Sequence, residues 1–191
     1  MHFVALDVET ANSLVSSICQ IGIAEYASGS LLSEWETLVN PQADFSPWNM
    51  QIHGITRGMV AYAPAFPDIY EDLAARMQGK IVVSHTHFDR SSLSRALQLY
   101  DLPPIECEWL DSAKVARRVW KQFARRGYGL KSLCNFLGYE FAHHNALADA
   151  KAAGFIMLEA CRHTGLNIED WLSALLVYGG RLKADKIHSV D

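Results

Sequence analysis

The stretch that decides the fold is FVALDVET, which runs from Phe3 to Thr10. Its apolar start, Phe3 to Val8, predicts a buried strand that begins almost at the first residue of the chain. Asp7 and Glu9 stand two positions apart, and side chains with that spacing on a strand point to the same face. Two carboxylates held together there repel each other unless a positive charge lies between them. The pair therefore predicts a site for a hard cation such as Mg²⁺ or Mn²⁺, with solvated acids at an exposed strand end as the plainer alternative.

Two further strands are predicted directly after this one. Residues 18–26 (ICQIGIAEY) and 31–39 (LLSEWETLV) alternate apolar and polar side chains, and residues 27–30 (ASGS) form a turn between them. Alternation with a period of two is typical of strands with one buried face. Three short strands joined by tight connections predict an antiparallel meander, which a loop over residues 40–47 follows.

The rest of the chain alternates between helical and strand patterns. Helices are predicted over residues 66–77, 91–99, 112–123, 130–137, 147–161 and 168–178, and strands over residues 80–84 and 107–110. Antiparallel strands followed by alternating strands and helices indicate an α/β fold, a mixed sheet with helices on its faces. A chain of 191 residues without an internal repeat or linker suits one domain. The last dozen residues are polar and are expected to be loosely held.

A second acidic position follows the predicted strand at residues 80–84. The segment SHTHFDR places Asp89 at a junction between that strand and a helix, where α/β proteins often carry chemistry. Capping the helix is the alternative role of Asp89. His85 and His87 in the same segment are interpreted as residues that line a turn.

A third acidic position lies in HHNALADA, residues 143–150. Asp149 belongs to an alanine-rich helix, and a carboxylate beside a buried helix face is costly unless it is paired or bound to a metal. Histidine titrates near neutral pH, so His143 or His144 just ahead of the helix would suit deprotonation of a water molecule. A place in a surface loop is the plainer role of such paired histidines.

Composition excludes several classes of protein. No apolar run approaches the ~20 residues of a membrane-spanning helix, and the start of the chain has no basic segment of the kind that opens a signal peptide. The four cysteines, Cys19, Cys107, Cys134 and Cys161, form no CxxC pair, and no HExxH segment occurs. A zinc site or a disulfide framework is therefore not expected. We expect reduced thiols in a cytoplasmic protein instead.

The net charge is −4, but the basic residues are unevenly spread. A stretch without any acid contains Lys114, Arg117, Arg118, Lys121, Arg125, Arg126 and Lys131. Such a block can hold phosphates by charge and hydrogen bonding, and a solvated helix face is the common alternative.

The order and spacing of the three acidic segments resemble those of the DEDDh exonucleases, the DnaQ-like family with a ribonuclease-H-like fold. The residues that match the family motifs are Asp7 and Glu9 in DVET, Asp89 in FDR, and His144 and Asp149 in HNALADA. Residues 52–56 (IHGIT), 20–22 (QIG) and 130–138 are similar to further stretches of the family. The resemblance covers roughly residues 3–160.

The resemblance implies a fold and a domain organisation. It implies a five-stranded mixed sheet, three antiparallel strands and then two parallel ones, with helices on both faces. Residues 1–165 would form the exonuclease domain, and residues 166–191 a C-terminal helix and tail packed on the same domain.

It also implies a 3′→5′ exonuclease that uses two Mg²⁺ or Mn²⁺ ions. The metal ligands would be Asp7, Glu9, Asp89 and Asp149, with Asp7 shared between the ions. The family spacing of five positions from histidine to aspartate selects His144 as the general base and leaves His143 as a loop residue. Thr10, Ala11, His53 and Phe88 would surround the terminal nucleotide, and stacking on Phe88 would tolerate any base.

The chain departs from the family at the second motif, which often reads HNAxFD. Here Ser84, His85 and Thr86 replace the first three residues, so contacts near the substrate are expected to differ while the metal ligands stay the same. The IHGIT segment is similar to the polymerase-proofreading branch, which favours a single-stranded or frayed 3′ end of DNA as the substrate and allows a polymerase partner. The alternatives are an exoribonuclease that trims RNA and a catalytically silent domain that binds nucleic acid or a polymerase.

Overall fold

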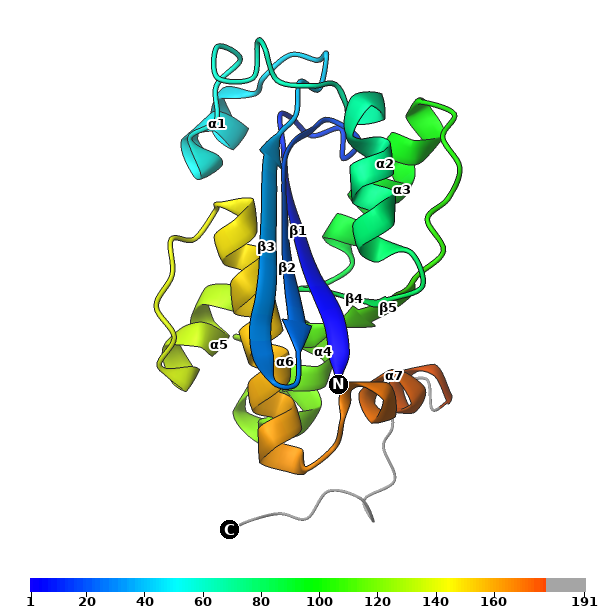
Figure 1. Cartoon of the computed structure of the whole chain (residues 1–191). Helices are drawn as coiled ribbons and strands as arrows, with labels where there is room; N and C mark the ends of the chain where they lie inside the picture. Colours follow the sequence, from blue (N-terminus) through cyan, green and yellow to red (C-terminus); the bar gives the residue numbers. More distant parts are fainter. Residues whose placement is uncertain (178–191) are drawn as a thin grey trace.

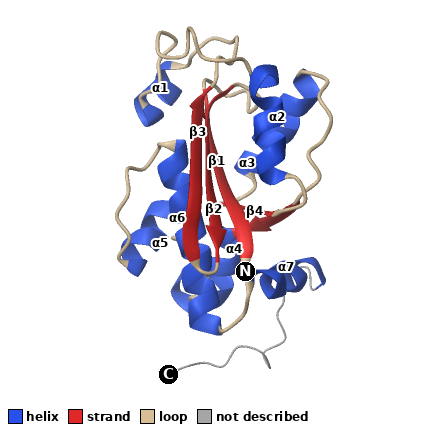
Figure 2. Cartoon of the chain, viewed as in Figure 1, coloured by secondary structure: helices blue, strands red, loops and turns tan. Residues whose placement is uncertain are grey.

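The strands of the computed structural model, which describes residues 1–177, form one five-stranded mixed sheet in the order β3-β2-β1-β4-β5 (Figure 2). β1 (His2–Thr10), β2 (Ile18–Ala27) and β3 (Ser30–Leu38) form the antiparallel meander. β4 (Ile81–Ser84) pairs in parallel with β1, and β5 (Glu108–Asp111) pairs in parallel with β4. The predicted mixed sheet is confirmed, with strand ends that differ from expectation by one or two residues.

Helices cover both faces of this sheet (Figure 1). They are α1 (Pro47–His53), α2 (Phe66–Met77), α3 (Phe88–Leu99), α4 (Ser112–Val119), α5 (Leu130–Leu137), α6 (Ala146–Thr164) and α7 (Ile168–Val177). One core cluster joins α2 and α3 to one face of the sheet. A second cluster joins α4, α5, α6 and α7 to the other face.

The alternation of side chains along β1 decides which face receives the acids. Val4, Leu6 and Val8 belong to the cluster under α2 and α3. Phe3 and Ala5 belong to the cluster under α6. Asp7 and Glu9 continue this second series, because side chains two positions apart share a face. Both carboxylates are therefore directed to the side of the sheet on which α6 lies.

Several helix limits differ from the sequence prediction. α1 was not predicted, because none of its residues is buried and its sequence carries no apolar stripe. α3 begins at Phe88 rather than at residue 91. α4 ends at Val119 rather than at residue 123, because Trp120 adopts an extended conformation and a short 3-10 turn, Lys121–Phe123, follows. α6 is longer than expected at both ends.

The C-terminal helix α7 contributes Ile168, Trp171 and Leu172 to the core cluster under α6. The predicted helix end at residue 178 and the polar tail lie outside the described residues. No helix among residues 1–177 is long and apolar enough to cross a membrane. In the same part of the chain all four cysteines are free thiols.

Candidate active site

Three carboxylates from two elements meet beside the end of β1. Asp7 and Glu9 come from β1, and Asp149 comes from the first turn of α6. One oxygen atom from each side chain lies within 4.8 Å of the other two. Asp149 is only 4% exposed, so this acidic group lies against the interior of the protein.

The fourth predicted acid, Asp89, lies beside this group and comes from the opposite face of the sheet. It is the second residue of α3 rather than its N-cap, and it is 2% exposed. Its Oδ1 atom accepts a hydrogen bond of 3.1 Å from the backbone N–H of Val8. This bond attaches the start of α3 to β1 at Val8, the residue between Asp7 and Glu9.

The four acids disfavour one another's ionised forms. Burial raises the pKa of Asp7 well above its ordinary value, and the charges of Asp89, Asp149 and Glu9 raise it further. Burial, followed by the charges of Asp149 and Asp89, raises the pKa of Glu9 to about 8. Burial also raises the pKa of Asp89, to about 7, and that of Asp149. A divalent cation would remove this repulsion, and oxygen donors are those that Mg²⁺ and Mn²⁺ prefer, so the residues present fit such an ion.

A hydrogen-bonded clamp holds the first turn of α6 on the sheet. Gln20 of β2 accepts a hydrogen bond of 3.1 Å from the buried backbone N–H of Ala146 and donates one of 2.8 Å to Glu36 of β3. Asn145, the N-cap of α6, donates a bond of 2.8 Å to the same oxygen of Glu36. Gly22, the next residue of β2 on this face, has no side chain to hold the helix away. These contacts place Asp149 opposite β1.

No sequence pattern marks this clamp as a functional feature. The QIG segment is only a point of similarity to the family, and Glu36 carries no signal of its own because its partner Asn145 is 109 residues away in the chain.

Both adjacent histidines contact Asp149. The Nδ1 atom of His143 lies 3.0 Å from Oδ2 of Asp149, and the backbone N–H of His144 donates to the same oxygen at 3.2 Å. The two imidazole rings are stacked with centroids 3.8 Å apart, and a ring nitrogen of each lies within 4.8 Å of an oxygen of Asp149. His143 was expected to be a loop residue; it does lie in the loop before α6, but its ring also engages this carboxylate.

The four predicted substrate contacts occupy different settings. His53, the last residue of α1, bonds the Thr10 carbonyl through Nε2 at 3.2 Å and accepts the Ile55 N–H through Nδ1, which defines a neutral ring with its proton on Nε2. His53 and His144 line one cleft of about 400 Å³. Ala11 is fully buried, so it contributes through the loop that it packs. Phe88 is 40% exposed at the start of α3 and is not a core residue.

The altered second motif forms a tied turn. His85 contacts the Ser112 hydroxyl through Nδ1 at 2.9 Å and the Tyr128 carbonyl through Nε2 at 2.8 Å. The Ser84 hydroxyl donates to the Thr86 carbonyl at 2.8 Å. These bonds fix the turn before Phe88 and so set the position of the start of α3.

Comparisons with known proteins agree with this geometry. A family model described as an exonuclease, RNase T, matches residues 4–157. The PolC-type DNA polymerase III of Oceanobacillus iheyensis is 29% identical over 159 residues, which are 81% of this chain and 11% of that protein. The PolC-type enzyme of Bacillus subtilis is 25% identical over 162 residues, 82% of this chain and 11% of that protein. The chain therefore spans only about a tenth of the length of these relatives.

Solved structures share the fold. Exonuclease X in complex with 5′ overhanging duplex DNA aligns with a TM-score of 0.73 and 25% identity, over 90% of this chain and 98% of that one. Escherichia coli exonuclease I in complex with a dA16 oligonucleotide aligns with a TM-score of 0.74 and 15% identity, over 93% of this chain and 43% of that one. The family match, the ribonuclease-H-like fold and the converging acids together establish that the chain belongs to the RNase T family of exonucleases, of the DEDDh type.

Proposed function

We propose that this chain is a divalent-metal-dependent 3′→5′ exonuclease that releases nucleoside 5′-monophosphates from the 3′ end of DNA. The observation that carries the proposal is the convergence of Asp7, Glu9 and Asp149 within 4.8 Å, with histidine nitrogens equally close to Asp149. Bringing these acids together lowers the stability of the folded protein, and apolar residues would pack the same space better. The acids are therefore best explained by a role in function.

Asp7, Glu9 and Asp149 would hold one Mg²⁺ or Mn²⁺ ion, and Asp89, with Asp7 shared, would hold a second. Such ions, when bound, lower the pKa of water and offset the charge that develops on the phosphate. His144 would take the proton from the attacking water as the oxygen–phosphorus bond forms. Burial and the neighbouring His143 lower the pKa of His144, which keeps its imidazole neutral and able to accept that proton at neutral pH. The bond from phosphorus to the 3′ oxygen of the shortened strand then breaks.

The terminal nucleotide would lie between the acids and the cleft that His53 and His144 share. Thr10 and Ala11 would shape the floor of this site, and the exposed ring of Phe88 would stack on a base. Stacking is tolerant of base identity, so little sequence preference is expected.

DNA is the proposed substrate, since Exonuclease X was solved with a DNA duplex and the curated relatives are DNA polymerases. We propose residues 1–165 as the exonuclease domain, with the C-terminal helix α7 as part of the same unit. These relatives are PolC-type DNA polymerases of bacteria by name, so a polymerase is a candidate partner and the cytoplasm a candidate place of action.

The test is degradation of 3′-labelled DNA and RNA oligonucleotides of matched sequence with Mg²⁺, Mn²⁺ or a chelator. We expect release of labelled 5′-monophosphate from DNA, dependence on the metal, and slower release from RNA. Faster cleavage of RNA would assign the exoribonuclease alternative. Absence of cleavage together with absence of Mn²⁺ binding by calorimetry would assign the silent binding domain.

A further inference from the structure

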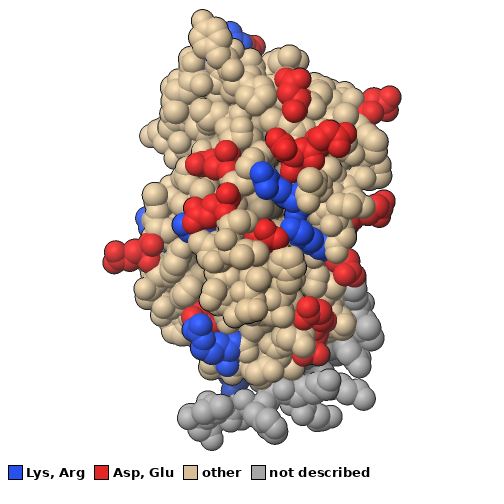
Figure 3. All heavy atoms as spheres, viewed as in Figure 1, with Lys and Arg blue, Asp and Glu red and all other residues tan. Residues whose placement is uncertain are grey.

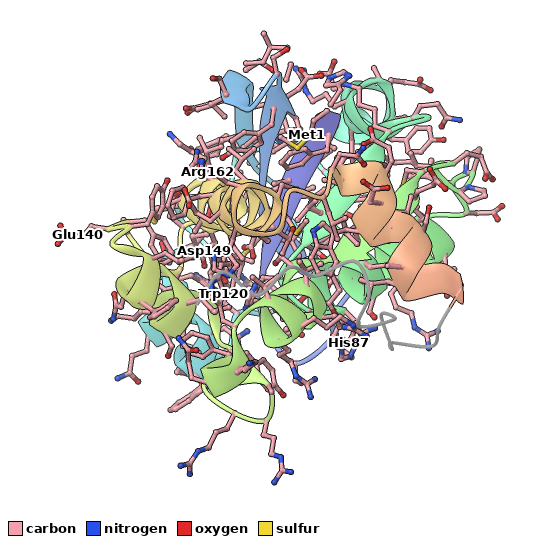
Figure 4. All side chains as sticks on the ribbon, turned by 90° about the horizontal axis from the view of Figure 1, so that it is seen from below. Met1, His87, Trp120, Glu140, Asp149 and Arg162 are labelled. Carbon is pink, nitrogen blue, oxygen red and sulfur yellow. The ribbon has the colours of Figure 1, made fainter. Side chains whose placement is uncertain are left out.

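A second cleft, of about 590 Å³, opens at the carboxyl ends of β4 and β5. Its walls come from the turn before α3, from α4 and from α7. Thr86 and His87 line it, and the next two residues of the chain are Phe88 and Asp89 of the candidate active site. Figure 4 shows His87 on the far side of α4 from Asp149. The cleft is therefore distinct from the acidic site but joined to it through the second-motif turn.

The cleft is strongly basic within an acidic protein. Among residues 1–177, Arg90 of α3 and Lys114, Arg117 and Arg118 of α4 line it, against one carboxylate, that of Asp111. On the face of the molecule seen in Figure 3, by contrast, Lys and Arg are interspersed with Asp and Glu. Cations on both walls of one cleft create a positive electrostatic potential, which favours a bound anion.

Within the described residues, the contacts of Lys114 and Arg117 leave their positive charges largely uncompensated. Asp111 already accepts the Lys114 backbone N–H at 3.0 Å and reaches its ammonium only at 3.9 Å. Arg117 donates through Nε to the Ala124 carbonyl at 3.1 Å, and its guanidinium lies 4.6 Å from the centre of the Tyr128 ring. Within residues 1–177, Arg90 is exposed and forms no ion pair.

Only part of the basic block, residues 114–131, lines this cleft. Lys114, Arg117 and Arg118 line it, whereas Arg125 and Arg126 do not, and Arg90 joins it from outside the block. The structural unit is therefore three cations on α4 facing one on α3, rather than seven along a line.

We propose that this cleft binds the sugar-phosphate backbone of the strand whose 3′ end lies at the acidic site, through phosphodiesters 5′ of the nucleotide being removed. The inference rests on the proposed function. Guanidinium and ammonium groups pair with phosphate oxygens, and such contacts position a strand without reading its sequence. Because the acidic site repels a polyanion, a positive cleft next to it supplies the attraction that the strand needs.

The test compares Arg90→Gln/Lys114→Gln with Arg125→Gln/Arg126→Gln, which removes the same charge from residues outside the cleft. Each is assayed on a long single-stranded oligonucleotide and on the p-nitrophenyl ester of thymidine 5′-monophosphate, which has no upstream phosphate. In the cleft variant the ratio of kcat/KM for the strand to kcat/KM for the ester should fall on the order of tenfold. The dependence of log kcat/KM on log salt should become shallower by roughly 0.7 per lost contact. The control pair should retain the wild-type ratio.

Equal loss in both pairs, or no loss in the cleft variant, overturns the proposal. If the wild type cleaves neither substrate, the proposed function fails, and the cleft is still tested by anisotropy of a fluorescent single strand in chelator. There the cleft variant should bind more weakly than the control pair. Full displacement of the strand by inorganic phosphate at matched ionic strength would mark a simple anion site and overturn the backbone assignment.

Discussion

Gly22 of β2 lies so close to Leu147 of α6 that a Cβ at Gly22 would stand 2.2 Å from the Leu147 backbone nitrogen. Gly22 pairs with Asp7 across β1 and β2, and Leu147 lies two residues before Asp149. The absent side chain therefore sets the separation between the two halves of the acidic site.

We expect Gly22→Ala to push the first turn of α6 away from the sheet. The overpacking should lower the free energy of unfolding by about 1–3 kcal/mol, measured by urea denaturation. It should lower kcat on the p-nitrophenyl ester more than Gly129→Ala does, since a Cβ at Gly129 meets no atom within 4 Å. If Gly22→Ala matches the control in both measurements, the close approach does not control the site.

This relationship illustrates what the sequence can and cannot predict. The apolar run and paired acids of β1 are local, so the strand and its carboxylates were predicted from their own neighbours. The clamp of Gln20, Glu36 and Asn145 joins three distant segments, and no local pattern marks Glu36 as a partner of the α6 cap.

The sequence does not predict the limits of helices that lack a buried apolar stripe or a side-chain cap. α1 exposes Trp48 by 70%, so its apolar residues carry no periodicity that a sequence pattern could detect. α3 begins after His87, which makes no side-chain cap bond, and a start without a cap leaves no local mark. The basic cleft was also hidden, because Arg90 and Lys114 come from different helices.

His143 and His144 both contact Asp149, so kinetics rather than distance must distinguish their roles. We expect His144→Ala to lower kcat by ~10²–10⁴, the usual contribution of a general base, with Mn²⁺ affinity retained. His143→Ala should lower kcat by less, because its ring orients the Asp149 carboxylate through the 3.0 Å contact. Single-turnover cleavage and calorimetric Mn²⁺ titration of both variants measure this. A larger loss in His143→Ala than in His144→Ala would transfer the role of base to His143.

Glu25 provides a pH-dependent contribution to stability far from the acidic site. Its Oε1 atom accepts hydrogen bonds from Lys80 at 2.6 Å and from His2 at 2.9 Å, and its Oε2 atom accepts one from Ser33 at 2.8 Å. These bonds, that of Lys80 first, lower the pKa of Glu25 to about 2. Because the folded pKa is depressed, the contribution is present above the ordinary carboxyl pKa of about 4.3 and is lost as the pH falls toward 2.

We therefore expect Glu25→Gln to lower the free energy of unfolding at pH 7 by about 1 kcal/mol or less, as is usual for a partly exposed ion pair. The difference from the wild type should shrink as the pH falls from 5 to 3 in chemical denaturation. Glu71→Gln, an exposed change on α2, is the control and should show no such trend. A difference that is constant with pH would mean that the bonds do not depend on the charge of Glu25.

Asp7 should be a residue whose removal costs activity and increases stability. Its carboxylate is half-buried beside Asp89, Asp149 and Glu9, and desolvation, followed by the repulsion from these three charges, raises its pKa. In chelator, Asp7→Asn removes one of the opposed charges, so the free energy of unfolding should rise by about 1 kcal/mol or more. In Mn²⁺ the wild type should be the more stable of the two. Its free energy of unfolding rises by ~2.7 kcal/mol at a metal concentration of about 100 Kd, whereas the variant has lost a shared metal ligand and should gain less.

Thermal unfolding of Asp7→Asn in chelator and in MnCl₂, with cleavage of a labelled oligonucleotide, measures both effects. Asp72→Asn, an exposed acid on α2, is the control and should change neither stability nor cleavage. Gathering four mutually repelling acids, two of them buried and two half-buried, is tolerable only if a cation is the natural occupant of the space between them. An Asp7→Asn variant that is less stable in chelator and still gains stability from Mn²⁺ would show that the acids serve the fold, and the assignment of Asp7 as a metal ligand would fail.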